Sequence, residues 1–529
     1  MRKIFFGIML TLVLTTSVSA SYIIQTTKSD YEFKTWIVDD DESADFNTIQ
    51  EAINAANPGD TVQVRAGTYY EHVVISKSIL LIGENRNTTV IDGKGTGTVV
   101  LISANHVNVT GFTVRNAGRN WGPPPGTGYP DSCIVGSGVT QVYVENNALT
   151  GAAVCVWFAY SSAVNVSNNI VFNGTYAGVI GWASYNITMY RNLVYDCGWM
   201  GIHLDGGSRN SIIADNTVMS TLEGIELERC AGNLVEGNRL LDNNVSIVLN
   251  RCGSFNVFRR NNMTSSQYNL IVFGYDLDSF MQDIDDSNVV NNKKVYYLTN
   301  RHDVIIDSSD HPNPGYLAVV NCTKITVKDF NVTRNGNGVL LAHSTNCTLT
   351  NMIISGNRGL LIGGGLTFYE SNNNTIINNE ISNNSYAVCL YRSDRNVFYH
   401  NSFIYNDRQV FPDFLSPFSN ESSGYFSVNV WDNGFEGNYW SDYTGGDANG
   451  DGIGDIPYVI DEKNQDNCPL TSPWIPIEQV PLWMQWWFWS IAAAGISVLA
   501  VSVYFLKKRK PPTPTAPILP SQSSDTAMK

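Results

Sequence analysis

A short phrase led by asparagine recurs along the chain at nearly constant intervals. Each copy continues through alternating apolar and polar residues and ends in another polar pair. Five copies begin 21, 24, 23 and 23 residues apart, and two later copies begin 22 residues apart, at Asn165, Asn186, Asn210, Asn233, Asn256, Asn374 and Asn396. A fixed period of about 20 to 50 residues marks architectures in which each unit contacts only its neighbours. The sequence therefore predicts a solenoid.

One copy of the phrase is too short to bury an apolar face by itself. Its alternating Val, Ile and Leu residues can instead meet the same residues of the next copy and form a continuous interior. Asparagine suits the corners, because it tolerates left-handed backbone conformations and can hydrogen bond to its neighbours along the stack. Parallel crossover connections are right-handed. We therefore expect an all-β fold, a right-handed parallel β-helix.

Both ends of such a stack expose strand edges and need covers. Residues 45–56 have helical apolar spacing, with Asp45 and Asn47 available as N-caps, and predict an N-terminal capping helix. The predicted organisation is a linker at 21–34, the N-terminal cap and first coils at 35–100, β-helix repeats at 101–430 with an insertion near 275–314, and a C-terminal cap at 431–475.

The two ends of the chain have the character of export and anchoring segments. Residues 1–20 combine a basic start, a short apolar run and a small-residue cleavage site, which predicts a signal peptide. Residues 484–506 are apolar, begin among tryptophans and stop at four basic residues, which predicts one transmembrane helix. The body would then be extracellular at the cell membrane, with residues 507–529 as a cytoplasmic tail.

Composition narrows the range of partners. The 33 basic and 48 acidic residues give a net charge of −15, which disfavours nucleic acid as a partner. The nine cysteines are spread along the chain and suit the role of small apolar fillers of the interior. Glycosylation sequons fit an exported surface and include Asn87, Asn108, Asn186, Asn321 and Asn420.

Several stretches resemble known families. Residues 46–53 (FNTIQEAI), 59–69 and 79–85 resemble the opening segment of pectin-lyase-like β-helices, and the asparagine-rich coils resemble the NosD-like repeat proteins. Residues 289–298, 437–443 and 447–460 are similar to the archaeal cell-surface branch of that family. The resemblance implies the fold and a surface location. It implies no single reaction, because such proteins include carbohydrate binders and sugar hydrolases.

Residues 447–458 match a calcium-binding loop in part. Position 12, where a bidentate glutamate is usual, is Tyr458, so Asp442, Asp461 or water would have to complete the coordination. We expect calcium as a structural clip, with an empty acidic turn as the alternative. The candidate ligands, at positions 1, 3, 5, 7 and 9, are Asp447, Asn449, Asp451, Ile453 through its carbonyl, and Asp455.

A candidate site follows from the alternation of one series of strands. If Ile202 and Leu204 face the interior, His203 and Asp205 face solvent, and one coil later Glu226 and Glu228 do the same. Trp157 and Trp182 occupy the outward position that Asp205 continues. The candidate catalytic residues are therefore His203, Asp205, Glu226 and Glu228, and the candidate carbohydrate-binding residues are Trp157 and Trp182.

The chemistry of this face leaves several functions open. Carboxylates on adjacent coils lie about 5 Å apart and those two residues apart on one strand about 7 Å, spacings that suit retaining and inverting glycoside hydrolysis. Tryptophan faces can stack on sugar rings, and the acids could instead hold calcium for an anionic sugar. We predict a membrane-anchored surface protein that binds a polysaccharide or other glycan. The alternatives are a glycoside hydrolase or polysaccharide lyase, an adhesion scaffold, and a NosD-type accessory of metal-cluster maturation.

Overall fold

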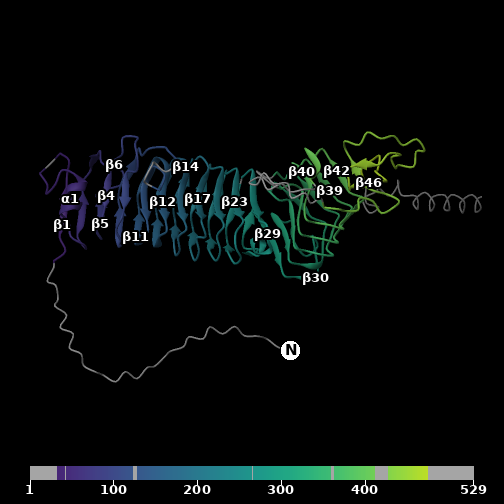
Figure 1. Cartoon of the computed structure of the whole chain (residues 1–529), viewed down its shortest axis with the longest axis horizontal. Coiled ribbons are helices and arrows are strands. Elements are labelled where there is room, and N and C mark those ends of the chain that lie inside the picture. The colour runs from purple at the N-terminus through teal and green to yellow at the C-terminus, as the bar shows by residue number, and fades with distance from the viewer. Residues whose placement is uncertain are drawn as a thin grey trace, which may run out of the picture.

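The computed structural model describes residues 32–474, except residue 42 and residues 123–127, 265, 359–362 and 412–426. These residues form an elongated solenoid of short, mostly parallel strands with two short helices (Figure 1). The predicted all-β parallel β-helix is confirmed. No helix in the described part of the chain is long and apolar enough to cross a membrane. The predicted signal peptide (1–20), transmembrane helix (484–506) and tail (507–529) lie outside the described residues.

The first stack runs from residue 35 to residue 290 and has three columns of strands. One column forms a sheet of its own: β1 (Thr35–Val38), β2 (Thr61–Val64), β5 (Leu80–Gly83), β8 (Val107–Thr110), β11 (Thr140–Glu145), β13 (Ser162–Ser167), β15 (Thr188–Tyr190), β18 (Ile212–Ala214), β21 (Leu234–Glu236), β24 (Val257–Arg259) and β27 (Asp283–Ile284). The second column contains β3 (Gly67–Tyr69), β6 (Thr89–Asp92), β9 (Thr113–Arg115), β16 (Leu193–Tyr195), β19 (Thr217–Met219), β22 (Arg239–Leu241), β25 (Asn262–Thr264) and β28 (Val289–Val290).

The third column carries the candidate site and is called the site sheet below. Two long strands, β12 (Ala148–Ala159) and β14 (Ile170–Trp182), run through both this column and the second one. The other strands of the site sheet are β4 (Val73–Ile75), β7 (Val100–Ile102), β10 (Ser132–Ser137), β17 (Met200–Asp205), β20 (Glu223–Glu228), β23 (Val245–Asn250) and β26 (Tyr268–Phe273).

A second stack follows from residue 293 to residue 440. Its first sheet contains β29 (Lys293–Thr299), β31 (Tyr316–Val320), β34 (Val339–Ala342), β37 (Leu366–Tyr369), β40 (Tyr386–Tyr391) and β43 (Arg408–Phe411). The other two sheets are β30 (His302–Asp307), β32 (Thr323–Lys328), β35 (Thr348–Thr350), β38 (Thr375–Ile377) and β41 (Val397–Tyr399), and β33 (Asn331–Thr333), β36 (Ile353–Ser355), β39 (Glu380–Ser382), β42 (Ser402–Ile404) and β44 (Tyr439–Trp440). A short antiparallel pair, β45 (Tyr458–Val459) and β46 (Gln465–Asp466), ends the described chain.

Buried asparagine ladders hold the coils in register, as the corner asparagines predict. In one ladder, the Oδ1 of each asparagine accepts hydrogen bonds from the backbone N–H and the side-chain amide of the asparagine one coil earlier. Its members are Asn147, Asn169, Asn192, Asn216, Asn238, Asn261 and Asn288. The residue before each of the first six members has a positive φ, which turns the chain at the corner. Burial leaves these amides no water, so each must be satisfied by the next coil.

The N-terminal helix α1 (Ile49–Ala55) is shorter than the predicted 45–56 and lies beside β1 (Figure 1). Its N-cap is Thr48 rather than Asp45 or Asn47, because the Thr48 hydroxyl accepts the backbone N–H of Glu51. Ile49 and Ile53 are buried in the core of the first stack. A capping role for this helix stays a prediction.

The predicted insertion near 275–314 contains the junction between the stacks. It carries helix α2 (Leu277–Phe280) and strands β27 to β30. The sheet of β29 is buried on both faces: Leu317 and Val319 belong to the core of the second stack, whereas Ala318 and Leu340 pack with Phe280 and the core of the first stack. One sheet of the second stack therefore closes the end of the first.

His343 lies at this junction, near the ring of Phe280 and 3.5 Å from the carboxylate of Glu370. Burial lowers the pKa of His343, and the charges of Glu370 and Asp276 partly oppose this. The unfolded chain therefore takes up a proton at this position at a higher pH than the folded protein does, so stability should fall as the pH drops below about 6.5. We expect His343→Gln to lose less thermal stability than the wild type between about pH 8 and pH 5. Equal losses in both proteins, measured by circular dichroism melting, would contradict this.

Candidate functional site

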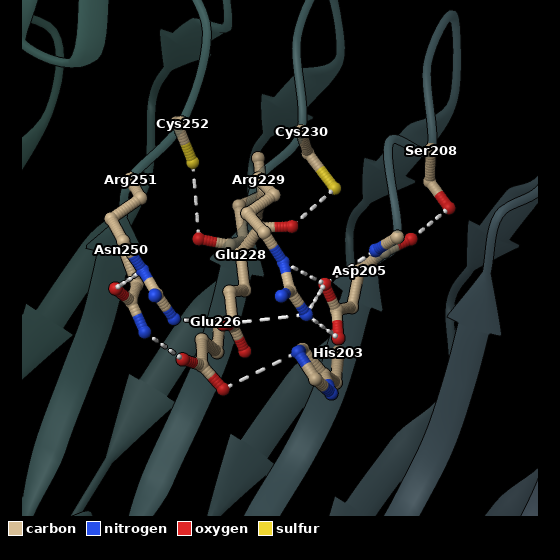
Figure 2. Close-up of polar contacts among 12 residues, drawn as sticks. His203, Asp205, Ser208, Glu226, Glu228, Arg229, Cys230, Asn250, Arg251 and Cys252 are labelled. Atoms are coloured by element: carbon tan, nitrogen blue, oxygen red, sulfur yellow. Dashed lines mark hydrogen bonds and ion pairs between the residues drawn. The ribbon is translucent and has the colours of Figure 1, made fainter. Parts of the chain in front are cut away.

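Strands β17 and β20 place the four candidate catalytic residues side by side on the outer face of the site sheet. His203 is the register partner of Glu226, and Ile202 is the partner of Ile225. Ile202 and Ile225 are buried in the core, so the predicted alternation is correct at these positions. Figure 2 shows the four side chains converging from neighbouring coils: His203, Asp205, Glu226 and Glu228.

The prediction that these residues face solvent is wrong for three of them. His203, Asp205 and Glu226 are only 4%, 2% and 4% exposed. Their side chains lie outside the core but are covered by neighbours. The row of His203 and Glu226 continues into the apolar Ile180 and Val248, and Asp205 lies between Trp182 and the side chain of Arg229. The acidic cluster therefore sits between two apolar clusters on the outer face. Alternation gives the direction of a side chain and says nothing of what covers it.

Two arginines, which the sequence did not place on this face, neutralise part of the cluster. Arg229 donates to both carboxylate oxygens of Asp205, at 2.9 and 3.0 Å through its Nη2 (Figure 2). Arg251 pairs with Glu228, and the Arg229 Nη2 lies 3.5 Å from the same Glu228 oxygen. Both arginines have positive φ values just after their strands. That turn breaks the alternation, so the pattern of the sequence could not indicate their direction.

A third glutamate also belongs to the cluster. Glu223 is 8% exposed, and its backbone N–H donates to the carbonyl of Trp199. Burial raises the pKa of its carboxyl group. Strict alternation would send Glu223 to the interior together with Ile225. Gly224 interrupts the alternation, because a Cβ there would meet Leu240 and the carbonyl of Ser246. Two successive positions therefore face inward and Glu223 faces out.

His203 and Glu226 face each other without a hydrogen bond. The His203 Nε2 lies 3.4 Å from the Glu226 Oε2, and neither of these atoms nor the His203 Nδ1 has a hydrogen-bond partner. Burial lowers the pKa of His203 to about 4, which leaves the imidazole neutral near pH 7. Burial, together with the charges of Glu223 and Glu228, raises the pKa of Glu226 well above its usual range.

Aromatic rings extend the site towards the earlier coils. Trp157, a predicted sugar-binding residue, is only 7% exposed, because it packs against Trp182 at 6.1 Å and Trp121 at 5.9 Å. The predicted row is wrong for Trp157: its register partner is Ile180, which continues to His203, whereas Trp182 is the partner of Asp205. The exposed rings are Trp121 and Trp199, at 40% and 45%, which the alternation could not identify since both lie outside the strands. Tyr176 joins them, 3.4 Å from the Trp121 ring and 5.7 Å from the Trp199 ring. Trp182 remains partly exposed.

The predicted calcium ligands lie in an exposed loop near the end of the described chain. Both carboxylate oxygens of Asp447 accept backbone N–H groups, from Gly450, Asp451 and Gly452. Tyr458, at position 12, donates its hydroxyl to Asp442, so neither residue points freely into the loop. Calcium binding by Asp447, Asn449, Asp451, Ile453 and Asp455 stays a prediction.

Only two groups of three or more metal-ligating side chains occur within the described residues. One consists of His203, Glu226 and Glu228, whose ligand atoms all lie within 4.8 Å of one another. The other consists of the consecutive Asp39, Asp40 and Asp41 near the N-terminus, of which Asp40 and Asp41 are exposed. The candidate site is thus the place where the fold brings together distant ligating groups.

The stacked coils and their outer acidic cluster define a parallel β-helix protein with a site on one sheet. The family described as "Periplasmic copper-binding protein (NosD)" matches residues 103–313 and 274–445. The chain belongs to the NosD family. The "Probable ABC transporter binding protein NosD" of Stutzerimonas stutzeri is 30% identical over 197 residues, which cover 34% of this chain and 42% of that protein. The match thus spans less than half of that relative.

Solved structures with a similar fold act on polysaccharides. The catalytic domain of a GH87 α-1,3-glucanase in complex with tetrasaccharides is 13% identical, with a TM-score of 0.37 over 76% of this chain and 69% of that one. The A-module of the Azotobacter vinelandii mannuronan C-5 epimerase AlgE4 is 14% identical, with a TM-score of 0.29 over 71% and 95%. Similarity at this level concerns the β-helix fold alone and carries no argument about the site.

Proposed function

We propose that the protein binds a glycan along the aromatic and acidic face of the site sheet. The observation that carries the proposal is a contiguous aromatic cluster of Trp121, Tyr176, Trp157, Trp182 and Trp199. It adjoins the acidic cluster, because the backbone N–H of Glu223 donates to the carbonyl of Trp199. Exposed indole rings offer flat apolar surfaces for the C–H faces of sugars, and polar groups beside them fix the orientation of the hydroxyls.

The exposed rings are the natural contact surface. Trp121 and Trp199 are each nearly half exposed, although burying a tryptophan is favourable. Both belong to one cluster rather than being scattered singly, a pattern that favours a binding surface. Arg229, half exposed above Asp205, adds hydrogen-bond donors at the edge of this surface.

The test is a polysaccharide array probed with the full chain. We expect Trp199→Ala and Trp182→Ala each to weaken binding by about tenfold, the loss typical of a tryptophan in a contact surface. Tyr405→Ala is the matched control, because Tyr405 is 75% exposed and lies in the second stack. Equal affinity of all three variants, or no binding by the wild type, would refute glycan binding at this face.

Cleavage is assayed in the same wells through released reducing or unsaturated ends. We expect binding without product, because Asp205 and Glu226 are covered and a glycosidic bond must reach both carboxyl groups of a hydrolase. Product that disappears in Glu226→Gln would replace the binding proposal by a glycoside hydrolase or lyase.

The loop at 447–455 is proposed to hold calcium as a structural clip. Its three aspartates and one asparagine occupy ligand positions of a calcium loop, and Gly450 and Gly452 have the positive φ values that its tight turn requires. Calcium at millimolar concentration should raise the melting temperature of the wild type and leave Asp447→Asn unchanged, as measured by calorimetry. A calcium shift that persists in Asp447→Asn would exclude this loop.

The body of the protein is proposed to lie outside the cytoplasmic membrane. The family description as periplasmic supports this placement, and the predicted signal peptide and transmembrane helix agree with it. Anchoring through residues 484–506 is part of the same proposal. Release of the body from intact cells by an added protease would support it, and full protection would contradict it.

A further inference from the structure

His203 is a buried histidine with no hydrogen bond on either ring nitrogen. Buried polar groups are nearly always paired, so an orphaned imidazole at 4% exposure indicates a missing partner. One of its nitrogens points at the Glu226 Oε2, which is also unpaired. Figure 2 shows both groups directed into the same space, next to the carboxylate of Glu228. A cation, which accepts electron pairs from nitrogen and oxygen together, would pair both groups.

We propose that His203, Glu226 and Glu228 form a binding site for a divalent transition-metal cation of the zinc type. The site goes beyond glycan binding and does not depend on it. Ligands held about 2.1 Å from a tetrahedral ion lie about 3.4 Å from each other. The distance between the His203 Nε2 and the Glu226 Oε2 is 3.4 Å, and the three ligand atoms lie within 4.8 Å of one another. Small rotations of Glu228 would complete the set.

The donor atoms select the kind of ion. An imidazole suits zinc and its first-row neighbours, whereas calcium and magnesium prefer oxygen ligands alone. Copper(I) prefers thiolate and thioether donors. Neither of the two groups of metal-ligating side chains within the described residues includes a cysteine. The residues therefore fit a divalent first-row ion better than the soft cuprous ion.

The surroundings hold the ligands in place, as the outer shell of a metal site does. Asn250 donates its amide to the Glu226 Oε1, which leaves Oε2 for the ion. Arg251 pairs with the Oε1 of Glu228, which leaves Oε2 for the ion. When all groups are ionised, the cluster has four carboxylates (Asp205, Glu223, Glu226 and Glu228) and two guanidinium groups (Arg229 and Arg251), and a divalent cation would balance the difference of two charges.

The experiment measures zinc on the full chain without any sugar. The protein is stripped with chelator, dialysed and titrated with zinc chloride, and bound zinc is counted by mass spectrometry. We expect the double variant His203→Gln, Glu226→Gln to bind one equivalent of zinc fewer than the wild type. Its affinity for zinc at this site should fall by more than about 100-fold, since even outer-shell changes lower metal affinity about 10- to 100-fold. The matched control is His343→Gln, Glu370→Gln, which removes a second, more exposed histidine–glutamate pair and should bind as the wild type does.

Two outcomes would overturn the proposal. One is the same zinc stoichiometry in the wild type and the double variant. The other is zinc X-ray absorption of the wild type that shows no nitrogen ligand at about 2.0–2.1 Å. If the double variant does not fold, Glu228→Gln replaces it, because the Glu228 side chain is 16% exposed and less deeply buried. Because no glycan is present, failure of glycan binding leaves this result unchanged.

Discussion

Asn238→Leu is expected to lower the free energy of unfolding by about 3–6 kcal/mol, since each buried polar group left without a partner costs about 1–3 kcal/mol. The Asn238 Oδ1 accepts two hydrogen bonds from Asn216, and its amide donates to the carbonyl of Ile213 and to Asn261. All of these groups are buried, and leucine can neither accept nor donate. Denaturant unfolding followed by circular dichroism measures the loss.

Asn87→Leu serves as the control for the ladder. Asn87 is an exposed corner asparagine of an early coil, outside the ladder. A surface change of this kind usually alters stability by no more than about 0.5 kcal/mol. If Asn238→Leu unfolded at the same denaturant concentration as Asn87→Leu, the ladder would not be what holds the coils in register.

Phe280→Ala is expected to cost about 3–5 kcal/mol and to separate the unfolding of the two stacks. Phe280 is fully buried and packs against Tyr369 at 4.7 Å, while its carbonyl accepts the hydroxyl of Tyr297 at 2.6 Å. Its ring fills the space between the end of the first stack and the sheet of β29. Removing the ring leaves a cavity between two units that each have a core of their own.

Calorimetry measures both the loss of stability and the separation of the unfolding of the two stacks. The wild type should unfold in one transition if the junction couples the stacks, and Phe280→Ala in two, because nearest-neighbour interfaces set the cooperativity of solenoids. Phe255→Ala is the control, since Phe255 is 73% exposed. A single transition in Phe280→Ala at the wild-type temperature would show that the junction does not depend on this side chain.

The repeats carried enough information to predict the fold class. The period set the length of one coil, and the apolar alternation correctly placed Ile202 and Leu204 in the interior. The corner asparagines indicated hydrogen bonding along the stack, which the ladders confirm. These features are local and recur from coil to coil, so each copy supports the same prediction of a parallel β-helix. The predicted N-caps, Asp45 and Asn47, lie three residues and one residue before the observed N-cap, Thr48. Several neighbouring polar residues could have capped the helix, so the sequence did not select among them.

The sequence did not predict how the two stacks pack at their junction. The break in rhythm near 275–314 was visible, but only the three-dimensional packing shows that the sheet of β29 closes the first stack. Contacts such as that between Phe280 and Tyr369 join residues far apart in the chain, and no local period encodes them.

For the site, the sequence determined which coils bring His203, Asp205, Glu226 and Glu228 together, because register follows from a constant period. The tertiary structure decided the rest: that three of the four are covered, that Arg229 turns onto the same face, and that His203 is left without a partner. The physical reason is that direction along a strand is a local property of the backbone. Burial and pairing depend on the side chains of neighbouring coils and on the corners where alternation breaks.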